Sequence, residues 1–238
     1  MAKVRRLFST SLVSYAVALV VMAALVIACP VAAQSTAAHP PAAAALKPDS
    51  GSASAGTYKN DFFSFSYSFP ADWKVQSQQE QRAIAERGHQ EAYDQDPNDS
   101  AEHKQALRYT WFLLGAAGKP AKTPQGPSLQ VIAFDLKGDR TFKNPKQFLG
   151  ELSAPIKAMG GQVTQAPTGK IIAGHKFTSV QYRVDTVTDD NKPLTVYWES
   201  ALTVERHHVL AWFFFSDSQA GLDQLARTLD SISFAAGK

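Results

Sequence analysis

The chain is poor in cysteine: its 238 residues contain one, Cys29. A single thiol excludes the internal disulfide framework that supports many small secreted proteins. Acidic residues are absent before Asp49, whereas Lys3, Arg5 and Arg6 are basic. These three bases account for the whole excess of 24 Lys and Arg over 21 Asp and Glu. The formal charge of +3 therefore gives no argument for a nucleic-acid partner, and we expect none.

The sequence also lacks the common signatures of catalysis and cofactor binding. It contains neither a Gly-x-Ser-x-Gly nucleophile elbow nor a Gly-x-Gly-x-x-Gly fingerprint, and the Gly-rich run 115–120 lacks the spacing of a phosphate loop. His207 and His208 are adjacent, so on a strand they point to opposite faces and do not easily share a metal ion. His175 follows a Gly turn and is expected to be exposed. We therefore expect no metal, no cofactor and no enzymatic activity.

The N-terminus has the organisation of an export signal. Residues 1–6 are basic, and residues 7–28 carry no charge and many Val, Leu and Ala side chains. Val31 and Ala33 then place small side chains at the positions that a signal peptidase recognises. This pattern predicts a signal peptide over residues 1–33, cleaved between Ala33 and Gln34, and an exported, periplasmic or extracellular protein.

Two other interpretations of this segment stay open. The uncharged run spans 22 residues, which is enough to cross a bilayer if it is not cleaved. Residues 26–29, Val-Ile-Ala-Cys, also resemble a bacterial lipobox, which would make Cys29 the site of lipidation. In each case contact with the membrane is expected only through this N-terminal segment.

Composition divides the rest of the chain into a linker and one domain. Residues 34–57 are rich in Ala, Pro and Ser and contain no aromatic residue, which predicts a flexible linker. All but two of the aromatic residues follow it, so residues 58–236 can bury a sizeable core. No internal repeat or second linker interrupts them, and we expect a single domain.

The pattern of apolar residues predicts mainly strands. In residues 63–69 aromatic side chains alternate with Ser, which indicates a strand with one apolar face. Residues 209–215 are apolar on both faces, as is typical of a central strand. Further strands are expected at 73–75, 108–114, 129–136, 169–172, 177–188 and 194–205.

Helices are expected between these strands. Residues 77–94 and 99–107 predict two helices, and Asn144 with Pro145 predicts the start of a third, with a kink or break at Pro155 and an end at Gly160. Ser216 and Gln219 resemble a capping box. It opens a final helix whose inner face comprises Leu222, Leu225, Leu229 and Ile232.

Together these elements predict an α/β fold of the α+β kind: an antiparallel sheet of about six or seven strands with helices on both faces. The order of elements resembles the PsbP-like α/β/α sandwich. The resemblance rests on the aromatic strand 63–69 with Pro70 and Trp73 after it, the turn at Gly174, the hairpin 197–215 and the C-terminal helix ending at 231–234. It covers residues 58–234.

Members of this superfamily are mostly non-catalytic binding or assembly proteins. Together with the export signal, the linker and the lack of a catalytic motif, the resemblance suggests an exported, non-enzymatic binding or accessory domain of the bacterial cell envelope. We expect it to act on an envelope protein through protein–protein contacts. Tyr109, Trp111 and Tyr197 are candidates for an apolar groove that receives a partner or ligand. Two alternatives are a carrier of a small apolar ligand and a hydrolase with a dispersed His and carboxylate site.

Overall fold

The computed structural model describes residues 46–95, 108–119, 126–136, 145–158, 160–187 and 192–235. Within these ranges the chain forms two antiparallel sheets, three α-helices and one short 3-10 helix. No helix in these ranges is both long and apolar enough to span a membrane. The predicted signal peptide, with Cys29, Ala33 and Gln34, lies outside the described residues, as does the helix expected at 99–107.

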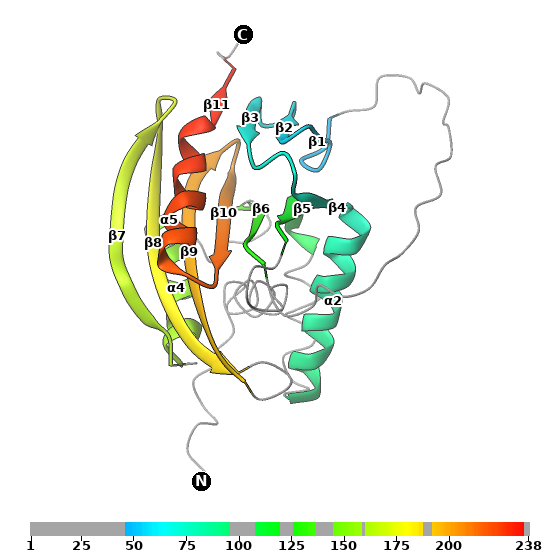
Figure 1. The fold of residues 1–238 in the computed structure, drawn as a ribbon. Helices are drawn as coiled ribbons and strands as arrows, with labels where there is room; N and C mark the ends of the chain where they lie inside the picture. Colours follow the sequence, from blue (N-terminus) through cyan, green and yellow to red (C-terminus); the bar gives the residue numbers. More distant parts are fainter. Residues whose placement is uncertain are drawn as a thin grey trace.

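The larger sheet has seven strands, each antiparallel to its neighbours (Figure 1). Its strand order is β4 (Lys74–Gln76), β5 (Thr110–Ala117), β6 (Ser128–Asp135), β10 (His208–Ser216), β9 (Pro193–Glu205), β8 (His175–Val187) and β7 (Gln162–Ile172). The apolar strand predicted to be central is β10, the middle strand of this sheet. All nine of its residues are buried, because packed elements cover both of its faces.

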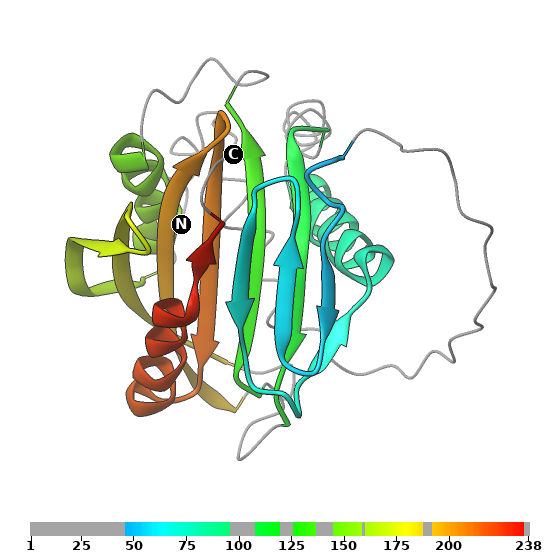
Figure 2. The ribbon, with the colours of Figure 1, turned by 90° about the horizontal axis from the view of Figure 1, so that it is seen from above.

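A smaller sheet of four strands covers part of one face of the larger sheet (Figure 2). Its order is β1 (Ser52–Ser54), β2 (Thr57–Asn60), β3 (Phe65–Ser68) and β11 (Ser233–Phe234). The segment 63–69 was expected in a single main sheet, but it supplies β3 of this second sheet. Its alternation is confirmed, since Phe63, Phe65, Tyr67 and Phe69 are all buried.

The end of the predicted linker is folded, which corrects the expectation of a flexible segment up to residue 57. Ser52–Ser54 form β1 and pair with β2. The Asn60 side-chain amide donates to the Pro48 carbonyl at 2.8 Å and to the Tyr58 hydroxyl at 3.0 Å. The strand pairing and the bond to Pro48 join residues 48–54 to the domain, although their Ser, Ala and Gly residues supply no apolar pattern.

Helices lie on both faces of the larger sheet. On one face α2 (Gln78–Gln95) and α4 (Pro145–Ala158) pack against a core that includes Phe148 and Phe213. On the other face α5 (Gln219–Arg227) and the 3-10 helix η2 (Thr228–Ser231) lie beside the smaller sheet (Figure 2). Their buried side chains share one core with Trp212. This arrangement confirms the predicted α/β fold class; the separate smaller sheet was not predicted.

Helix α4 follows the prediction with one difference. It runs through Pro155 as one helix, where a kink or break was expected. It ends as predicted at Gly160, which adopts a left-handed φ of 83°, and the Gly161 amide donates to the Ile156 carbonyl at 2.8 Å. Asn144, the predicted N-cap, lies outside the described residues.

The N-cap of helix α5 lies two residues after the predicted one. Its N-cap is Ser218, whose hydroxyl accepts from the Gly221 amide at 3.2 Å, so the capping box at Ser216 was wrong. The Ser216 hydroxyl instead accepts from the Ser218 amide at 3.3 Å. The four apolar side chains named for the inner face are buried as predicted: Leu222, Leu225, Leu229 and Ile232. The helix is shorter than predicted, because α5 ends at Arg227, Leu229 lies in η2 and Ile232 follows it.

Strand β7 is longer than the sequence indicated. The strand expected at 169–172 extends back to Gln162, and ten of its eleven residues are exposed. Its pairing with β8 is irregular between Val163 and Thr168. An edge strand of this kind lacks apolar alternation, because neither face is deeply buried.

Candidate functional site

A polar groove lies between the outer strands of the larger sheet and α5. Its volume is about 250 Å³, and its walls come from β7, β8 and β9 on one side and from the end of α5 with η2 on the other. Figure 1 shows β7 and β8 arching beside α5. The residues that matter most for its chemistry are Gln165, Thr168, Lys170, Ser179, Gln181 and Glu199.

Strand register brings these side chains together. Gln165 on β7 pairs with Gln181 on β8, which pairs with Glu199 on β9. Directly paired residues of neighbouring antiparallel strands point to the same face. The three side chains therefore form one polar row on the α5 face, where most of the sheet is apolar.

Glu199 is held in place by a chain of amide groups. The Gln181 amide nitrogen donates to Glu199 Oε2 at 2.7 Å, and the Gln219 amide nitrogen donates to Gln181 Oε1 at 3.1 Å. Gln219 also donates to Asp223 Oδ1 at 2.7 Å. Because Gln219 is the first residue of α5, the chain fixes the start of this helix to β8 and orients Gln181 towards the carboxyl group.

Burial sets the acidity of Glu199. Its side chain is 4% exposed. Removal from water raises the pKa of this carboxyl group, which hydrogen bonds from Gln181 and Ser179 partly counteract. Asp223 raises the pKa further, and Lys170 lowers it. A carboxyl group with a raised pKa in an open groove is a candidate for a functional site.

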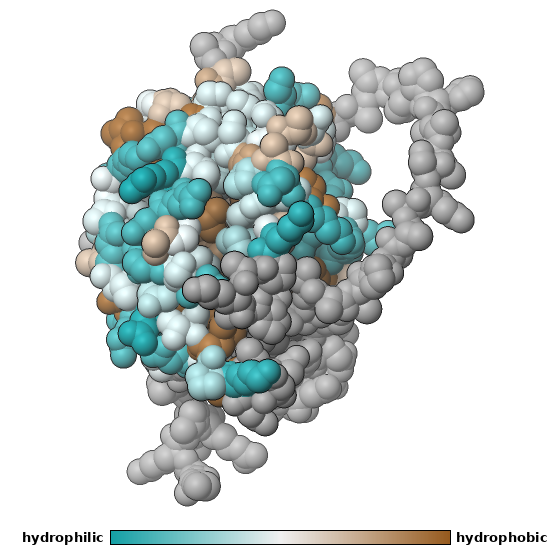
Figure 3. All heavy atoms as spheres, viewed as in Figure 1, coloured by the Kyte–Doolittle hydropathy of each residue, from teal (hydrophilic) through white to brown (hydrophobic). Residues whose placement is uncertain are grey.

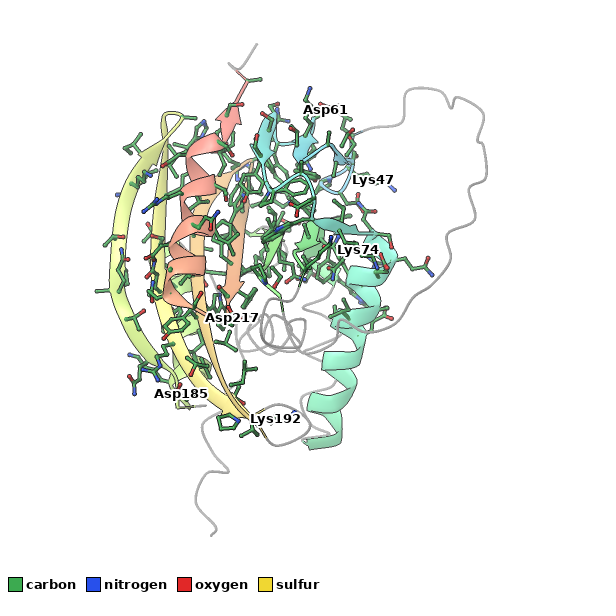
Figure 4. The ribbon with its side chains drawn as sticks, in the orientation of Figure 1. Lys47, Asp61, Lys74, Asp185, Lys192 and Asp217 are labelled. Carbon is green, nitrogen blue, oxygen red and sulfur yellow. The ribbon has the colours of Figure 1, made fainter. Side chains whose placement is uncertain are left out.

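The exposed carboxylate of Asp185 has its pKa shifted in the opposite direction to that of Glu199. Asp185 on β8 accepts from the Thr195 hydroxyl at 2.7 Å and forms a salt bridge with Arg183 at 3.0 Å. The Thr195 hydrogen bond, followed by the Arg183 contacts, lowers the pKa of Asp185. Figure 4 shows Asp185 near the lower end of the sheet, and it is absent from the groove lining.

The rim of the groove is charged and its floor is apolar. Lys170 on β7 forms an ion pair with Asp230 on η2, which spans the groove. Arg227 is exposed at the same rim. The floor includes Phe177 and Leu229, both buried. The groove thus combines oriented amide, hydroxyl and carboxyl groups with an apolar floor.

The aromatic residues proposed as a groove do not come together. Trp111 on β5 lies in the row that passes through Ala133 to Leu210, whereas Tyr197 on β9 pairs with Ser216. Six positions along β10 separate these rows, about 20 Å at the usual rise of a strand.

Tyr109 lies just before β5, near Trp111, and its carbonyl accepts from the Asp135 amide at 2.9 Å. Trp111 and Tyr197 are both partly buried against the core. The three proposed residues therefore lie in two separate places.

The adjacent histidines His207 and His208 both lie away from the groove. His208 is buried, its ring lies edge-on to Phe62 and Phe63, and its Nδ1 lies 2.9 Å from the Arg206 carbonyl. His207 is exposed in the turn before β10, with a left-handed φ of 65°. Neither lines the groove.

His175 contacts the carboxylate of Glu205. His175 Nδ1 pairs with Glu205, and the imidazole stacks on Phe234 with ring centroids 3.8 Å apart. His175 was expected to be exposed; its side chain is partly buried, because Phe234 covers the ring. The pair lies outside the groove lining and links β8 and β9 to the C-terminal strand. Within the described ranges no three His, Cys, Asp or Glu residues form a group able to hold a metal ion.

Sequence reasoning missed the groove, although one signal was present. Glu199 is the one charged residue between Pro193 and Val204, a long strand of otherwise neutral side chains. A strand covered on both faces buries any acid that it carries, and a buried Glu is rarely without a partner. Its partners Gln181 and Gln219 could not be inferred, because they depend on strand register and on the position of α5.

Comparisons with known proteins give similarities of fold. No family model matches the chain, and no curated protein matches it. Similar solved structures include LpqN of Mycobacterium tuberculosis, a protein involved in cell envelope biogenesis (12% identity, TM-score 0.43, 72% of this chain and 83% of that chain). Another is the cyanobacterial PsbP of Synechocystis sp. PCC 6803 (10% identity, TM-score 0.43, 75% of this chain and 91% of that chain).

A third similar structure is PA94 of Pseudomonas aeruginosa, a protein of unknown function (11% identity, TM-score 0.35, 54% of this chain and 81% of that chain). At these identities the similarities concern the course of the backbone, and they carry no activity, ligand or partner. The resemblance to PsbP-like proteins rests on the order of elements along the chain.

Proposed function

We propose that the chain is an exported, non-enzymatic accessory domain of the bacterial cell envelope that binds a partner protein through the groove beside α5. The export part rests on the N-terminal pattern of a basic segment, an uncharged run and small residues before Gln34. The binding part rests on the groove. Neither part requires a metal or a cofactor.

One observation carries the proposal: a buried carboxyl group, Glu199, lies in an open groove and is held by oriented amides. Burial of a carboxylate lowers stability unless its hydrogen bonds compensate fully, and the raised pKa of Glu199 indicates that they do not. A neutral side chain of the same shape, such as Gln, is therefore expected to stabilise the fold. Retention of the acid is therefore expected to serve recognition, as one oriented acceptor among amide and hydroxyl groups.

The surroundings of Glu199 favour binding over hydrolysis. Its nearest polar groups, Gln181 and Ser179, are a neutral amide and a hydroxyl that both bond to it. The pair of His175 and Glu205, which would suit the alternative of a hydrolase, stacks on Phe234 and lies outside the groove lining.

Site-specific photo-crosslinking in intact cells of the source organism tests the proposal. A photoreactive amino acid at Thr168, an exposed residue of the groove wall, is expected to capture one protein partner. The same amino acid at Lys59, exposed on β2, is the matched control and is expected to capture none. The Glu199→Gln change should reduce capture at position 168. Equal capture at both positions, or capture of a lipid or small molecule alone, would refute the proposal.

Export is tested separately by the intact mass of the mature protein from a membrane and a soluble fraction. We expect a chain that begins at Gln34. A diacylglyceryl mass on Cys29 would identify a lipoprotein, and an uncleaved chain would identify a membrane anchor. A full-length chain confined to the cytoplasm would contradict the envelope role.

A further inference from the structure

The outer edge of β7 is open in the part of the chain that the structure describes. β7 is the last strand of the larger sheet and pairs there with β8 alone. Its Ile171 side chain is 65% exposed, the highest value among the large apolar side chains described. Figure 3 shows apolar colour at the upper left, near the tip of the β7–β8 hairpin.

The hairpin turn determines which backbone groups face outward. Ala173 and Gly174 form a two-residue turn with φ of 48° and 84°, the type I′ geometry. In such a hairpin the flanking pair, Ile172 and His175, exchanges both backbone hydrogen bonds, and bonded and non-bonded pairs then alternate. The amide and carbonyl groups of Gly169 and Ile171 therefore point away from β8.

A hydrogen bond to Lys176 on β8 supports this alternation of bonded and non-bonded pairs. Lys176 pairs with Ile171, so its carbonyl should point away from β7 and towards β9. The Thr203 hydroxyl of β9 donates to that carbonyl at 3.1 Å.

Only a short part of the β7 edge can accept another strand, because the first half of β7 is protected. Pro167 has no amide hydrogen, and the pairing with β8 is irregular between Gln165 and Thr168. Proline and irregular pairing are the usual means of protecting a sheet edge. The segment 169–172 has neither, so the unprotected donors and acceptors are those of Gly169 and Ile171.

Among the described residues, nothing requires a glycine at position 169. Its φ is not in the left-handed region, and a Cβ atom there would meet one neighbour, the Phe177 carbonyl oxygen at 3.9 Å, an ordinary contact. Glycine inside a strand lowers stability by about 0.5–1 kcal/mol relative to alanine. Glycine without an internal reason is typical of a strand that another backbone approaches closely.

The charges beside the open segment favour an acidic partner. Lys176 is exposed next to Ile171 on one face of the hairpin. On the other face Lys170 is balanced by Asp230, while Arg227 at the groove rim adds a second positive charge. Within the described residues no ion pair balances Lys176 or Arg227.

We propose that an extended, acidic segment of the partner protein adds to β7 as an eighth strand of the larger sheet. Its backbone bonds to Gly169 and Ile171, an apolar side chain lies against Ile171, and a carboxylate faces Lys176. This inference rests on the proposed function only in taking the partner to be a protein. It adds the mode of binding and the chemistry of the bound segment.

Amide hydrogen exchange of the full mature chain, followed by NMR, tests the inference. The probe is a short capped peptide that alternates valine and glutamate. It should slow exchange at Gly169 and Ile171 about tenfold or more, since their amides become bonded. The amides of Lys170 and Ile172, which already bond to β8, should change little. The same peptide with lysine in place of glutamate should bind about tenfold more weakly.

Two variants test whether the peptide binds at the edge of β7 rather than in the groove. Ile171→Pro removes an outward amide without removing a bond to β8, and it should weaken peptide binding about tenfold. Ile171→Glu leaves the backbone intact and should weaken binding, because its carboxylate repels the glutamates of the peptide. This variant keeps the test decisive if the proline variant unfolds. Lys59→Glu is the control for charge alone and should bind as the wild type does.

Three results would overturn the inference: no binding, protection spread evenly over the domain, or slow exchange at Gly169 and Ile171 that depends on protein concentration without peptide. The last would identify a second copy of this chain as the added strand. Capture of a partner at Thr168 without peptide binding at the edge would refute this mode of binding and leave the proposed function intact.

Discussion

Replacement of Glu199 by Gln should make the protein more stable at neutral pH. The change keeps the shape of the side chain and an acceptor for the Gln181 amide, but removes the ionisable group. Transfer of a carboxylate from water into a protein costs several kcal/mol. The hydrogen bonds from Gln181 and Ser179 each return about 1.5–3 kcal/mol. Together they return about 3–6 kcal/mol, which is close to that cost, and the raised pKa indicates that desolvation still outweighs them. We therefore expect a small gain in the variant, on the order of 1 kcal/mol.

The effect should depend on pH with a defined sign. Burial raises the pKa of Glu199 in the folded protein above its value in the unfolded chain. The folded state therefore binds this proton more tightly, and the wild type loses stability as pH rises from the unfolded pKa, about 4.3, through the folded pKa. The variant carries no such group, so the two proteins should converge in acid and diverge towards neutral pH.

Urea denaturation at a series of pH values, followed by the fluorescence of the buried Trp198 and Trp212, measures this difference. Asp223→Asn is the matched control: Asp223 is exposed and belongs to the same amide chain, and its replacement should change stability by less than about 0.5 kcal/mol. A Glu199→Gln variant that is less stable at neutral pH would refute the reasoning, because it would make the carboxylate a structural anchor. A difference that does not change with pH would also refute it.

Three further changes test the fold. Phe65→Ala should lower the free energy of unfolding by about 3–5 kcal/mol in urea, because this buried ring packs on Trp212 between the two sheets. Ser218→Ala should lower it by about 1 kcal/mol through loss of the α5 cap, as a fall in Tm would show. Gly56→Ala should lower it by about 1–3 kcal/mol, since Gly56 has φ of 74° and a Cβ atom would lie 2.6 Å from the Phe69 carbonyl. Unchanged stability in any of them would contradict the packing described for that position.

Local pattern was enough to predict the elements with a strong apolar face. The alternation of residues 63–69 marks the inward side chains of β3, and the spacing of Leu222, Leu225 and Leu229 marks the inner face of α5 and η2. These predictions succeeded because each depends only on residues close together in the sequence, within a single element or two adjacent ones. The central place of β10 followed from its apolar character on both faces.

The separation into two sheets could not be predicted from local pattern. β11 pairs Ser233 with Ser66, far apart in the sequence, and β1 is built of Ser and Ala without apolar alternation. The first half of β7 was missed for a related reason: an exposed edge strand has no buried face, so its side chains follow no hydrophobic period.

The candidate site was harder to predict than the fold. The proposed aromatic groove assumed that Trp111 and Tyr197 were neighbours, but their places in the strand register separate them. The groove that exists depends on alignment of Gln165, Gln181 and Glu199 across three strands, and such alignment is set by turns and irregular pairs rather than by composition.

The most direct test of the account is the affinity of the Glu199→Gln variant for the protein captured at Thr168. If Glu199 is kept for recognition, the variant should be more stable than the wild type and yet bind that partner about tenfold more weakly or worse, a loss typical of a group that serves function at the expense of stability. Equal affinity of wild type and variant, measured with the full mature chain, would contradict the claim that the groove is the binding site.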